Sequence, residues 1–597
     1  MYRQLRANKK RYVEYNRFRK AIFMELAPKE GFYVLYLLPW LLSINHPSCP
    51  GYLAGLKRPF RVFHIDNDPE IRKRESQFKR MFGITSRGSL LKPSSEYHII
   101  QGLYTIGSVG TISQTSSSDC DTWVCYDKSE YDEQAWQKLN QKINLIKDWL
   151  DMNIKMPVFF FISELSDIQQ NNFGSLDGES CGSSQRNVLK EEFYRTSIVI
   201  SGKLPLWWLC HSPDKSLDYR EALSAITNDE YGFYEVVDFG NLEIVEKDEY
   251  FGSALWQFHK SLSNPLKSII KMVLLKMLVD AAQEALICHR FRAAIMEQDE
   301  GEILTDPSVF TIHSIFDYYA DNDLEVQEFL KECFYLRCDL KPYDKKSTLK
   351  REIAAELYRE FPLDIKTRLR LSKFQSWDFN EQVELGEQLF RLLLKIYKDI
   401  FSTHSKSSEV MSKQDLTILG RIISTCHQAK KHKVNIIKKP TGTLNTSNLT
   451  LKMDNELWLV YSGMDNKLLL FSHTDIIQLI SYLVWNNLFV ESRISMEPNP
   501  SSVTLQEIIN LGRKIRDFVG GVNVTSIDHD HFLRKERVIK MLVIVSFEKS
   551  PYEKDINDFS VVYRNSWGEL FVDRFNSPRK LQNFLKKYTI DPMVTDT

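Results

Sequence analysis

The chain has 597 residues, of which 43% are hydrophobic and 26% are charged, a composition typical of a globular protein. Its 78 Lys and Arg residues equal its 78 Asp and Glu residues, so the formal net charge is zero. This balance argues against a dedicated nucleic-acid-binding protein, which would carry a basic excess. The length exceeds that of a single hydrophobic core and predicts about three or four domains.

The first segment, residues 1–95, is predicted to be helical at first and then rich in loops, and to pack on the domain that follows. Its N-terminal end is basic and aromatic and lacks the apolar core of a secretory signal. The most apolar run, residues 32–44, is too short to cross a membrane and contains Pro39, which predicts a buried helix with a kink. We therefore expect a cytoplasmic protein with no membrane span.

Residues 96–215 alternate between strand-like and helix-like patterns, which is typical of a mixed α/β domain. The apolar stretch at 156–163 predicts a buried strand, and the stretch at 203–210 predicts another. Residues 133–150 have the periodicity of an amphipathic helix. The other strands of this domain are predicted at 97–107, 121–127 and 193–202.

The pattern is mainly helical over residues 216–400. Two polar stretches rich in small residues, 402–414 and 438–450, then interrupt it. Beyond them, short strand-like runs alternate with a helix predicted at 475–489. Residues 415–597 are therefore predicted to form a second, smaller α/β domain.

The 9 cysteines are scattered, and no two CxxC pairs stand at the spacing of a zinc site. Most of them lie among apolar residues, as Cys333 and Cys338 do. They are predicted to be reduced thiols in the protein core.

A loop of small polar residues begins at Gly107 and Ser108, directly after the first predicted strand of the mixed domain. Asp119 and Asp121 follow at the start of the next strand, one residue apart. Because a strand sends alternate side chains to opposite faces, both carboxylates should share a face with Trp123. Two close carboxylates repel each other, and divalent cations remove that repulsion. The pattern therefore indicates a two-metal site for phosphoryl or nucleotidyl transfer.

Each of these signals has an ordinary explanation when it stands alone. A Gly-Ser pair in a loop is usually a turn, and Asp-x-Asp at a strand end is often a solvated edge or a cap. Their order in this chain, however, resembles the DNA-polymerase-beta-like nucleotidyltransferase fold. That resemblance implies that Gly107 and Ser108 hold a triphosphate through backbone N–H groups and the hydroxyl. It also implies that Asp119 and Asp121 hold magnesium.

A second resemblance covers nearly the whole chain. The chain resembles the class I adenylate cyclases of enterobacteria and related bacteria, because seven segments keep that family's order and spacing. His259 stands where the family usually has tyrosine, and Phe571 and Val572 stand where Arg-Thr would follow. The seven segments are 46–53, 107–125, 174–196, 249–261, 265–271, 332–337 and 563–570.

The family resemblance implies an α+β fold in which a nucleotidyltransferase-type mixed sheet with helices forms a catalytic core at 96–215. A helical domain at 216–400 and the smaller α/β domain would follow. The implied reaction is attack of the 3′-hydroxyl of ATP on its own α-phosphate, giving 3′,5′-cyclic AMP and pyrophosphate. Mg²⁺, or Mn²⁺ in its place, would be held by Asp119 and Asp121, and Ser108 would act on the phosphates.

Two further side chains next to the carboxylates are candidates for contacting the nucleotide. Ser118 either caps the turn or touches a phosphate. Trp123 either supports the adenine or the ribose, or belongs to the core, where large aromatic side chains are common.

Two cationic side chains are candidates for the triphosphate. Arg195 either reaches the phosphates or forms an ion pair with Glu191 or Glu192 at helical spacing. Lys260 either lies near the β- and γ-phosphates or belongs to a solvated helix face. The sequence leaves both alternatives open.

The superfamily usually places a third carboxylate on the neighbouring strand. Here that strand is apolar until Glu164, which comes so late that it could lie beyond reach of the metals. If it does, the base that activates the hydroxyl is Asp121 alone or a group from elsewhere, such as Glu192.

Two other functions use the same motif. One is a nucleotidyltransferase that adenylylates an external acceptor, and the other is a catalytically inactive nucleotide sensor that regulates a partner. The family-wide resemblance favours the cyclase, with ATP as its substrate and no nucleic-acid partner.

Family members commonly continue into a C-terminal region linked to control by the sugar phosphotransferase system. This chain stops soon after the segment at 563–570. We therefore expect the phosphotransferase regulator not to act on this chain.

Overall fold

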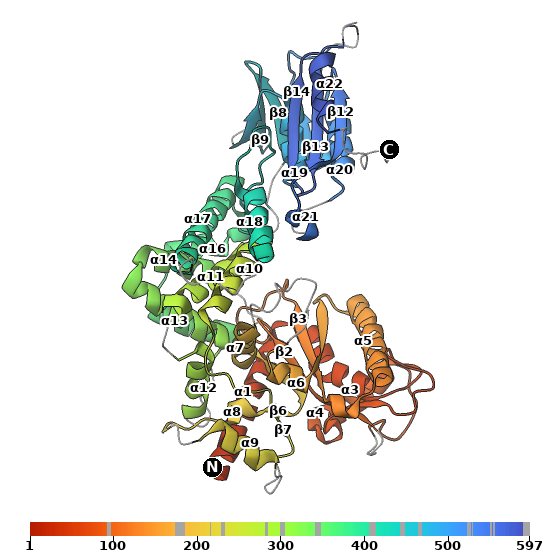
Figure 1. Ribbon diagram of the computed structural model, residues 1–597, viewed down its shortest axis with the longest axis vertical. Helices are drawn as coiled ribbons and strands as arrows, with labels where there is room; N and C mark the ends of the chain where they lie inside the picture. The colour runs from red at the N-terminus through yellow and green to blue at the C-terminus, as the bar shows by residue number, and fades with distance from the viewer. Residues whose placement is uncertain are drawn as a thin grey trace. The chain divides into compact units, whose positions relative to one another are not determined.

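The structure is a computed structural model. It describes residues 1–91, 97–172, 186–214, 217–227, 233–280, 285–298, 305–340, 348–404, 413–441, 444, 448–463, 468–521, 527, 529–549, 552 and 556–588. The chain forms two compact units, each of which combines helices with β-sheet (Figure 1). Unit 1 comprises Met1–Ser253 and Met277–Ser372, and unit 2 comprises Ala254–Lys276 and Lys373–Thr597. The α+β fold class predicted from the sequence is confirmed.

Unit 1 is built on a five-stranded mixed sheet in the order β1-β2-β3-β4, with β5 also paired to β2. Strands β2 and β3 are antiparallel, whereas β3 and β4 are parallel and are joined by helix α5. The strands of unit 1 are β1 (Phe60–Val62), β2 (His98–Ile106), β3 (Cys120–Tyr126), β4 (Val158–Glu164), β5 (Ile198–Gly202), and the short pair β6 (Leu204–Pro205) and β7 (Val236–Val237).

The helices of unit 1 cover both faces of this sheet, and Figure 1 shows α5 and α7 on opposite sides of it. They are α1 (Tyr2–Leu26), α2 (Pro28–Phe32), η1 (Tyr33–Leu37), α3 (Leu38–Ser43), η2 (Ile65–Asn67), α4 (Pro69–Met81), η3 (Lys128–Glu130), α5 (Glu133–Asn153), α6 (Leu165–Gln169), α7 (Arg186–Thr196), α8 (Leu206–Leu209), α9 (Tyr219–Thr227), α12 (Ile287–Glu297), α13 (Pro307–Asn322), α14 (Leu324–Arg337), α15 (Thr348–Glu360) and α16 (Ile365–Ser372). Helices α10 (Lys247–Lys260) and α11 (Pro265–Asp280) run from one unit into the other.

Two separate hydrophobic cores lie on the two faces of the sheet of unit 1. Cys120 and Val124 of β3 face the core that includes residues of α3, α4 and α5. Trp123 and Cys125 face the other core, which includes residues of α1, α7, α8 and α12. The alternation predicted for β3 from the sequence is therefore confirmed.

Unit 2 contains a four-stranded sheet in the order β10-β9-β8-β11 and a three-stranded sheet in the order β12-β13-β14. Helix α19 packs on both β10 and β14, and its apolar residues share one core with residues of both sheets. The elements of unit 2 are η5 (Phe374–Ser376), α17 (Phe379–His404), α18 (Lys413–His427), β8 (Leu449–Asp454), β9 (Leu457–Ser462), β10 (Leu468–His473), α19 (Ile476–Trp485), η6 (Glu491–Arg493), β11 (Ile494–Met496), α20 (Leu505–Val519), α21 (His529–Leu533), β12 (Val538–Val545), β13 (Phe559–Asn565), β14 (Leu570–Phe575) and α22 (Pro578–Lys586).

Residues 32–43 are helical and mostly buried, as predicted, and the π-helix η1 interrupts the α-helix just before Pro39, which lies in the first turn of α3. Two other predictions of local structure were wrong in part. Strand β4 is not buried: Phe159 is 40% exposed, since β4 is an edge strand that pairs with β3 alone among the described strands. The stretch at 203–210 forms only the two-residue strand β6 and then turns into helix α8. Short apolar runs do not distinguish a strand from a buried helical turn.

The eight described cysteines are buried and none forms a disulfide, as the sequence predicted for core thiols. No helix among the described residues is long and apolar enough to span a bilayer.

Candidate functional site

The loop after β2 is a compact turn held by its own hydrogen bonds. Gly107 begins it with a φ of 95°, a conformation that favours glycine. The carbonyl oxygen of Ser108 accepts from the hydroxyl of Thr111 at 2.8 Å and from the backbone N–H of Thr111 at 3.2 Å. The N–H of Gly110 donates to the side-chain oxygen of Gln114 at 2.8 Å. These bonds give the loop a defined shape.

A buried arginine from α1 supports this turn from the side of the core. The guanidinium of Arg19, which is fully buried, donates to the carbonyl oxygens of Gly110 at 2.7 Å, Val109 at 3.0 Å and Thr196 at 2.8 Å. It also donates to the hydroxyl of Tyr15 at 2.7 Å. One side chain therefore ties the turn to both α1 and the end of α7.

The backbone N–H groups at the start of the turn have different partners. Gly107 donates its N–H to the hydroxyl of Thr196 at 3.0 Å, so this group is not directed at a ligand. The N–H groups of Ser108 and Val109 have no acceptor among the described residues. A Cβ at Gly107 would meet no protein atom within 4 Å, so the turn borders open space. Two amides and a Ser108 hydroxyl next to open space are suitable for binding an anion.

The register of β2 and β3 brings the two carboxylates next to this turn. Asp121 pairs with Ile106, the residue directly before Gly107. The hydroxyls of Ser108 and Ser118 lie 3.2 Å apart, and Ser118 also accepts from the N–H of Thr115 at 3.0 Å. Ser118 therefore stabilises the turn. Of the two roles predicted from the sequence, capping the turn and touching a phosphate, these bonds match the first.

Asp119 and Asp121 are both partly exposed, whereas Cys120 between them is fully buried. Burial, together with the charges of both carboxylates, raises the pKa of the Cys120 thiol to about 12. The charges of both carboxylates thus act on the same buried thiol, and both side chains keep part of their surface in solvent. Carboxylate oxygens in this arrangement fit Mg²⁺, which binds through one or two carboxylates and takes its other ligands from phosphates and water.

The neighbouring strand supplies no third carboxylate at this end of the sheet. The residue of β4 opposite Asp121 is Phe159, and Glu164 pairs with Tyr126 at the far end of β3. Five residues of strand separate the two positions, which corresponds to about 16 Å. Glu164 instead caps α6, accepting from the N–H of Asp167 at 3.1 Å. Across the described parts of the chain, no three Asp, Glu, His or Cys side chains are placed to hold a metal ion by themselves.

Helix α7 packs against Trp123 on the carboxylate face of β3 and carries two of the predicted residues, Glu192 and Arg195. Trp123 is 2% exposed and stacks on Phe193 with ring centroids 4.7 Å apart, which favours the core alternative for this tryptophan. Glu192 lies one helical turn before Thr196, the partner of Gly107, and is half-buried. Of the two candidates for a third acidic group, Glu164 and Glu192, this placement makes Glu192 the one nearer the turn.

Arg195 forms an ion pair with Glu191, which is one of the two roles predicted for it; the other was phosphate binding. Its guanidinium donates to Glu191 at 2.9 Å and to the hydroxyl of Thr311 at 3.0 Å, and both charged groups are buried. Burial alone would lower the pKa of Arg195, but the charge and hydrogen bonds of Glu191 raise it above its usual value. Glu191 also accepts from the N–H of Cys288 at 3.0 Å, so this pair links α7 to α12.

The segment at 249–261 contributes to both units. Glu249 caps the start of α7, accepting from the N–H of Asn187 at 2.7 Å, and so helps to position that helix. Lys260 lies in unit 2, with its ammonium group 5.1 Å from the centroid of the Trp256 ring. The role of Lys260 in binding phosphate stays a prediction.

Two cationic side chains near the turn were not singled out from the sequence. Lys350, near the start of α15, donates to the carbonyl oxygen of Gln114 at 3.2 Å. Burial lowers the pKa of Arg337, at the end of α14, while the neighbouring Cys338 and the carboxylate charge of Asp119 act in the opposite direction. Both lie on helices far along the chain from the turn. Arg337 belongs to the family-like segment at 332–337, whereas Lys350 belongs to none of the seven segments.

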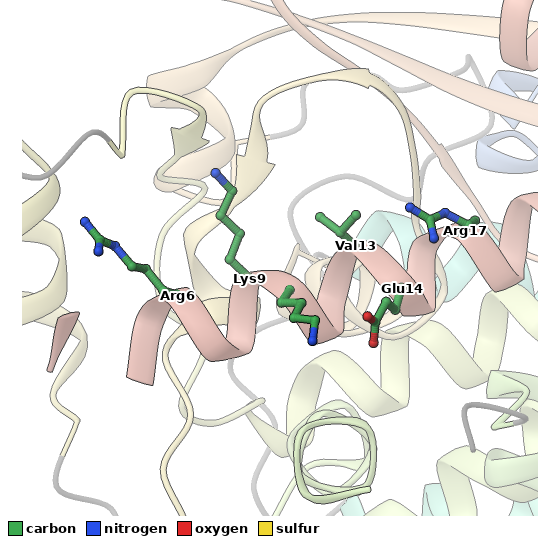
Figure 2. Close-up of a pocket in the computed structure, with 6 residues that line it drawn as sticks. Arg6, Lys9, Val13, Glu14 and Arg17 are labelled. Carbon is green, nitrogen blue, oxygen red and sulfur yellow. The ribbon is translucent and has the colours of Figure 1, made fainter. Parts of the chain in front are cut away.

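A groove of about 310 Å³ lies elsewhere, on the face of α1 that points away from the core. Figure 2 shows its labelled residues Arg6, Lys9, Val13, Glu14 and Arg17 projecting from this one helix. Arg19 and the other buried residues lie on the opposite face, so the groove is separate from the turn and the carboxylates.

Comparison with known proteins identifies the family of the chain. The model of the adenylate cyclase NT domain matches residues 4–208, and the model of the class-I adenylate cyclase second domain matches residues 245–438. The chain belongs to the class-I adenylate cyclase family. The first of these models includes the turn and both carboxylates, and the second includes α14 and α15.

Relatives from several bacteria share this family. The chain is 29% identical to adenylate cyclases of Escherichia coli O6:H1 and Salmonella typhimurium over 74% of its own length. It is 26% identical to the adenylate cyclase of Pasteurella multocida over 93% of its length and 71% of that relative. The chain spans 53% of the length of the Escherichia coli and Salmonella class-I relatives. No solved structure matches the chain.

The buried arginine under the turn gives a stability prediction. We expect Arg19→Met to lower the free energy of unfolding by about 3 kcal/mol, because buried carbonyl oxygens would lose their donor. The matched control is Arg17→Met, on the exposed face of α1, which should change stability by less than about 0.5 kcal/mol. Urea unfolding followed by tryptophan fluorescence measures both. Equal midpoints for the two variants would show that Arg19 does not support the turn.

Proposed function

We propose that this chain is an adenylate cyclase that converts ATP to 3′,5′-cyclic AMP and pyrophosphate. The observation that carries the proposal is the pairing of Ile106 with Asp121, which joins the anion-binding turn to the two carboxylates. Family membership and the name of the relatives, adenylate cyclase, support the same reaction. A triphosphate bound at the turn would have its phosphates next to Asp119 and Asp121.

Asp119 and Asp121 are the residues that would hold Mg²⁺. When bound, the metal supplies positive charge that lowers the pKa of the attacking hydroxyl and stabilises the departing pyrophosphate. The partial exposure of the two carboxylates fits a metal that completes its coordination with substrate phosphates.

The residues of the chain position the nucleotide for in-line attack. The N–H groups of Ser108 and Val109 and the Ser108 hydroxyl bind phosphate oxygens, and Arg19 keeps the turn in the shape that presents them. The 3′-oxygen of the ribose forms a bond to the α-phosphorus while the bond from that phosphorus to the β-phosphate oxygen breaks. We assign the hydroxyl proton to Asp121. The neighbouring strand β4 places Phe159 opposite Asp121 and therefore offers no carboxylate at that position as an alternative base. Catalysis then depends on positioning and on charge stabilisation.

The first test is product analysis. The purified chain, incubated with ATP and Mg²⁺ or Mn²⁺, should release cyclic AMP and pyrophosphate in equal amounts, and EDTA should abolish the reaction. Chromatography of the products distinguishes the three functions that share the motif. Transfer of AMP to another molecule without a cyclic product would contradict the proposal, and so would ATP that is bound but not consumed.

The second test concerns the carboxylates. Asp119→Asn and Asp121→Asn should each remove more than about nine-tenths of the turnover, because loss of a metal costs several kcal/mol of transition-state stabilisation. Their melting temperatures without metal should not fall, since the substitution relieves carboxylate repulsion. Asp127→Asn, just beyond the other end of β3, is the matched control and should keep full activity. Retention of activity by either of the first two variants would exclude a metal-binding role for that residue.

The third test separates binding from catalysis at the turn. Ser108→Ala should lower kcat by about 10²-fold or more and change KM less, because its hydroxyl bonds to an oxygen whose charge grows as pyrophosphate leaves. Ser117→Ala, on the exposed part of the same loop, is the control. Gly107→Ala should weaken ATP binding, since its Cβ would enter the open space in front of the turn. An unchanged kcat for Ser108→Ala would leave Ser108 with the structural role of a turn residue.

A further inference from the structure

Two cations, Arg337 at the end of α14 and Lys350 near the start of α15, lie where these helices contact the loop after β2. Three contacts fix these helices on the turn and on α1. The Sγ of Cys338 lies 3.6 Å from the hydroxyl of Ser113, and Lys350 donates to Gln114 at 3.2 Å. The N–H of Leu349 donates to the carboxylate of Glu25 at 3.0 Å. The residue after Arg337 and the residue before Lys350 thus both make fixed contacts, and Lys350 itself bonds to the loop.

Neither cation has a direct ion-pair partner among the described residues. Arg337 and Asp119 interact electrostatically without forming a direct ion pair. Burial lowers the pKa of Lys350, and the nearby positive charge of Arg337 lowers it further, against the effects of Cys338, Asp339 and Asp306. Two partly buried positive charges that repel each other are unfavourable unless an anion joins them.

The carboxylates around Lys350 do not supply that anion. Asp306 is fully buried and accepts from the N–H groups of Ile112 at 2.8 Å and Ser308 at 2.8 Å. Asp339 follows the end of α14 and is exposed. Arg195, the cation expected from the sequence to serve the phosphates, is occupied by Glu191. Among the described residues of α14 and α15, Arg337 and Lys350 thus supply positive charge that no carboxylate binds directly.

We propose that Arg337 and Lys350 bind the β- and γ-phosphates of a nucleoside triphosphate and the pyrophosphate that it releases. The two amides of Ser108 and Val109 face the same turn, so the site combines neutral donors with two cations, as a polyphosphate requires. The identity of the nucleotide rests on the proposed function, whereas polyphosphate binding does not.

Binding of inorganic pyrophosphate and tripolyphosphate tests this assignment without any turnover. Isothermal titration should show at least tenfold weaker binding for Arg337→Gln and Lys350→Gln than for the wild-type chain. Arg351→Gln removes an exposed cation next to Lys350 on α15 and should bind as the wild type does. Arg337→Lys keeps the charge and should recover part of the affinity. In steady-state kinetics with ATP, both glutamine variants should raise KM and lower kcat.

A thermal-shift measurement guards against loss of folding in the variants. Pyrophosphate should raise the melting temperature of the wild type and of Arg351→Gln, but not that of Arg337→Gln or Lys350→Gln. If all variants bind pyrophosphate equally while the wild type forms cyclic AMP, this assignment is wrong and the cyclase proposal stands. If pyrophosphate binding is lost only in the two glutamine variants and no cyclic AMP forms, the assignment holds and the cyclase proposal is wrong.

Discussion

The antiparallel pairing of β2 with β3 is the constraint on which the whole site depends. Because Ile106 pairs with Asp121, the end of one strand and the start of the next lie side by side, and the turn between them closes on its own hydrogen bonds. A shift of the register by one residue would turn Asp121 and Trp123 to the opposite core. Burial of Trp123 on Phe193 opposes such a shift.

Two arginines serve the turn in different ways. Arg19 is fully buried, and its donors are used by backbone carbonyl oxygens and a tyrosine, so it determines the shape of the turn. Arg337 directly precedes Cys338, which contacts Ser113 of the loop, and we propose that its charge serves a ligand. The last residue of α7 links the start of the turn to Arg19. The hydroxyl of Thr196 accepts from the N–H of Gly107, and its carbonyl oxygen accepts from Arg19.

Much of the local structure could be predicted from the chain alone. The alternation of Asp119, Asp121 and Trp123 and the order of the turn and the carboxylates depend on neighbouring residues, and the structure agrees with them. The predictions that failed concern short apolar runs. The stretch around Trp207 and Trp208 reads equally well as a strand or a helical turn, and nothing in β4 itself indicates that it lies at the edge of the sheet.

The amino-acid sequence by itself determined the family, the class of the fold and the pair of carboxylates, because each follows from residues close together or from segments in a fixed order. Only the tertiary structure decided which cations face the turn. Arg195 is near the motif along the chain but is neutralised by Glu191 one helical turn away. Arg337 and Lys350 are more than two hundred residues from Gly107 along the chain, and the packing of α14 and α15 on Ser113 and Gln114 brings them to the loop that Gly107 begins. Charge compensation depends on distances in space, which sequence separation does not reveal.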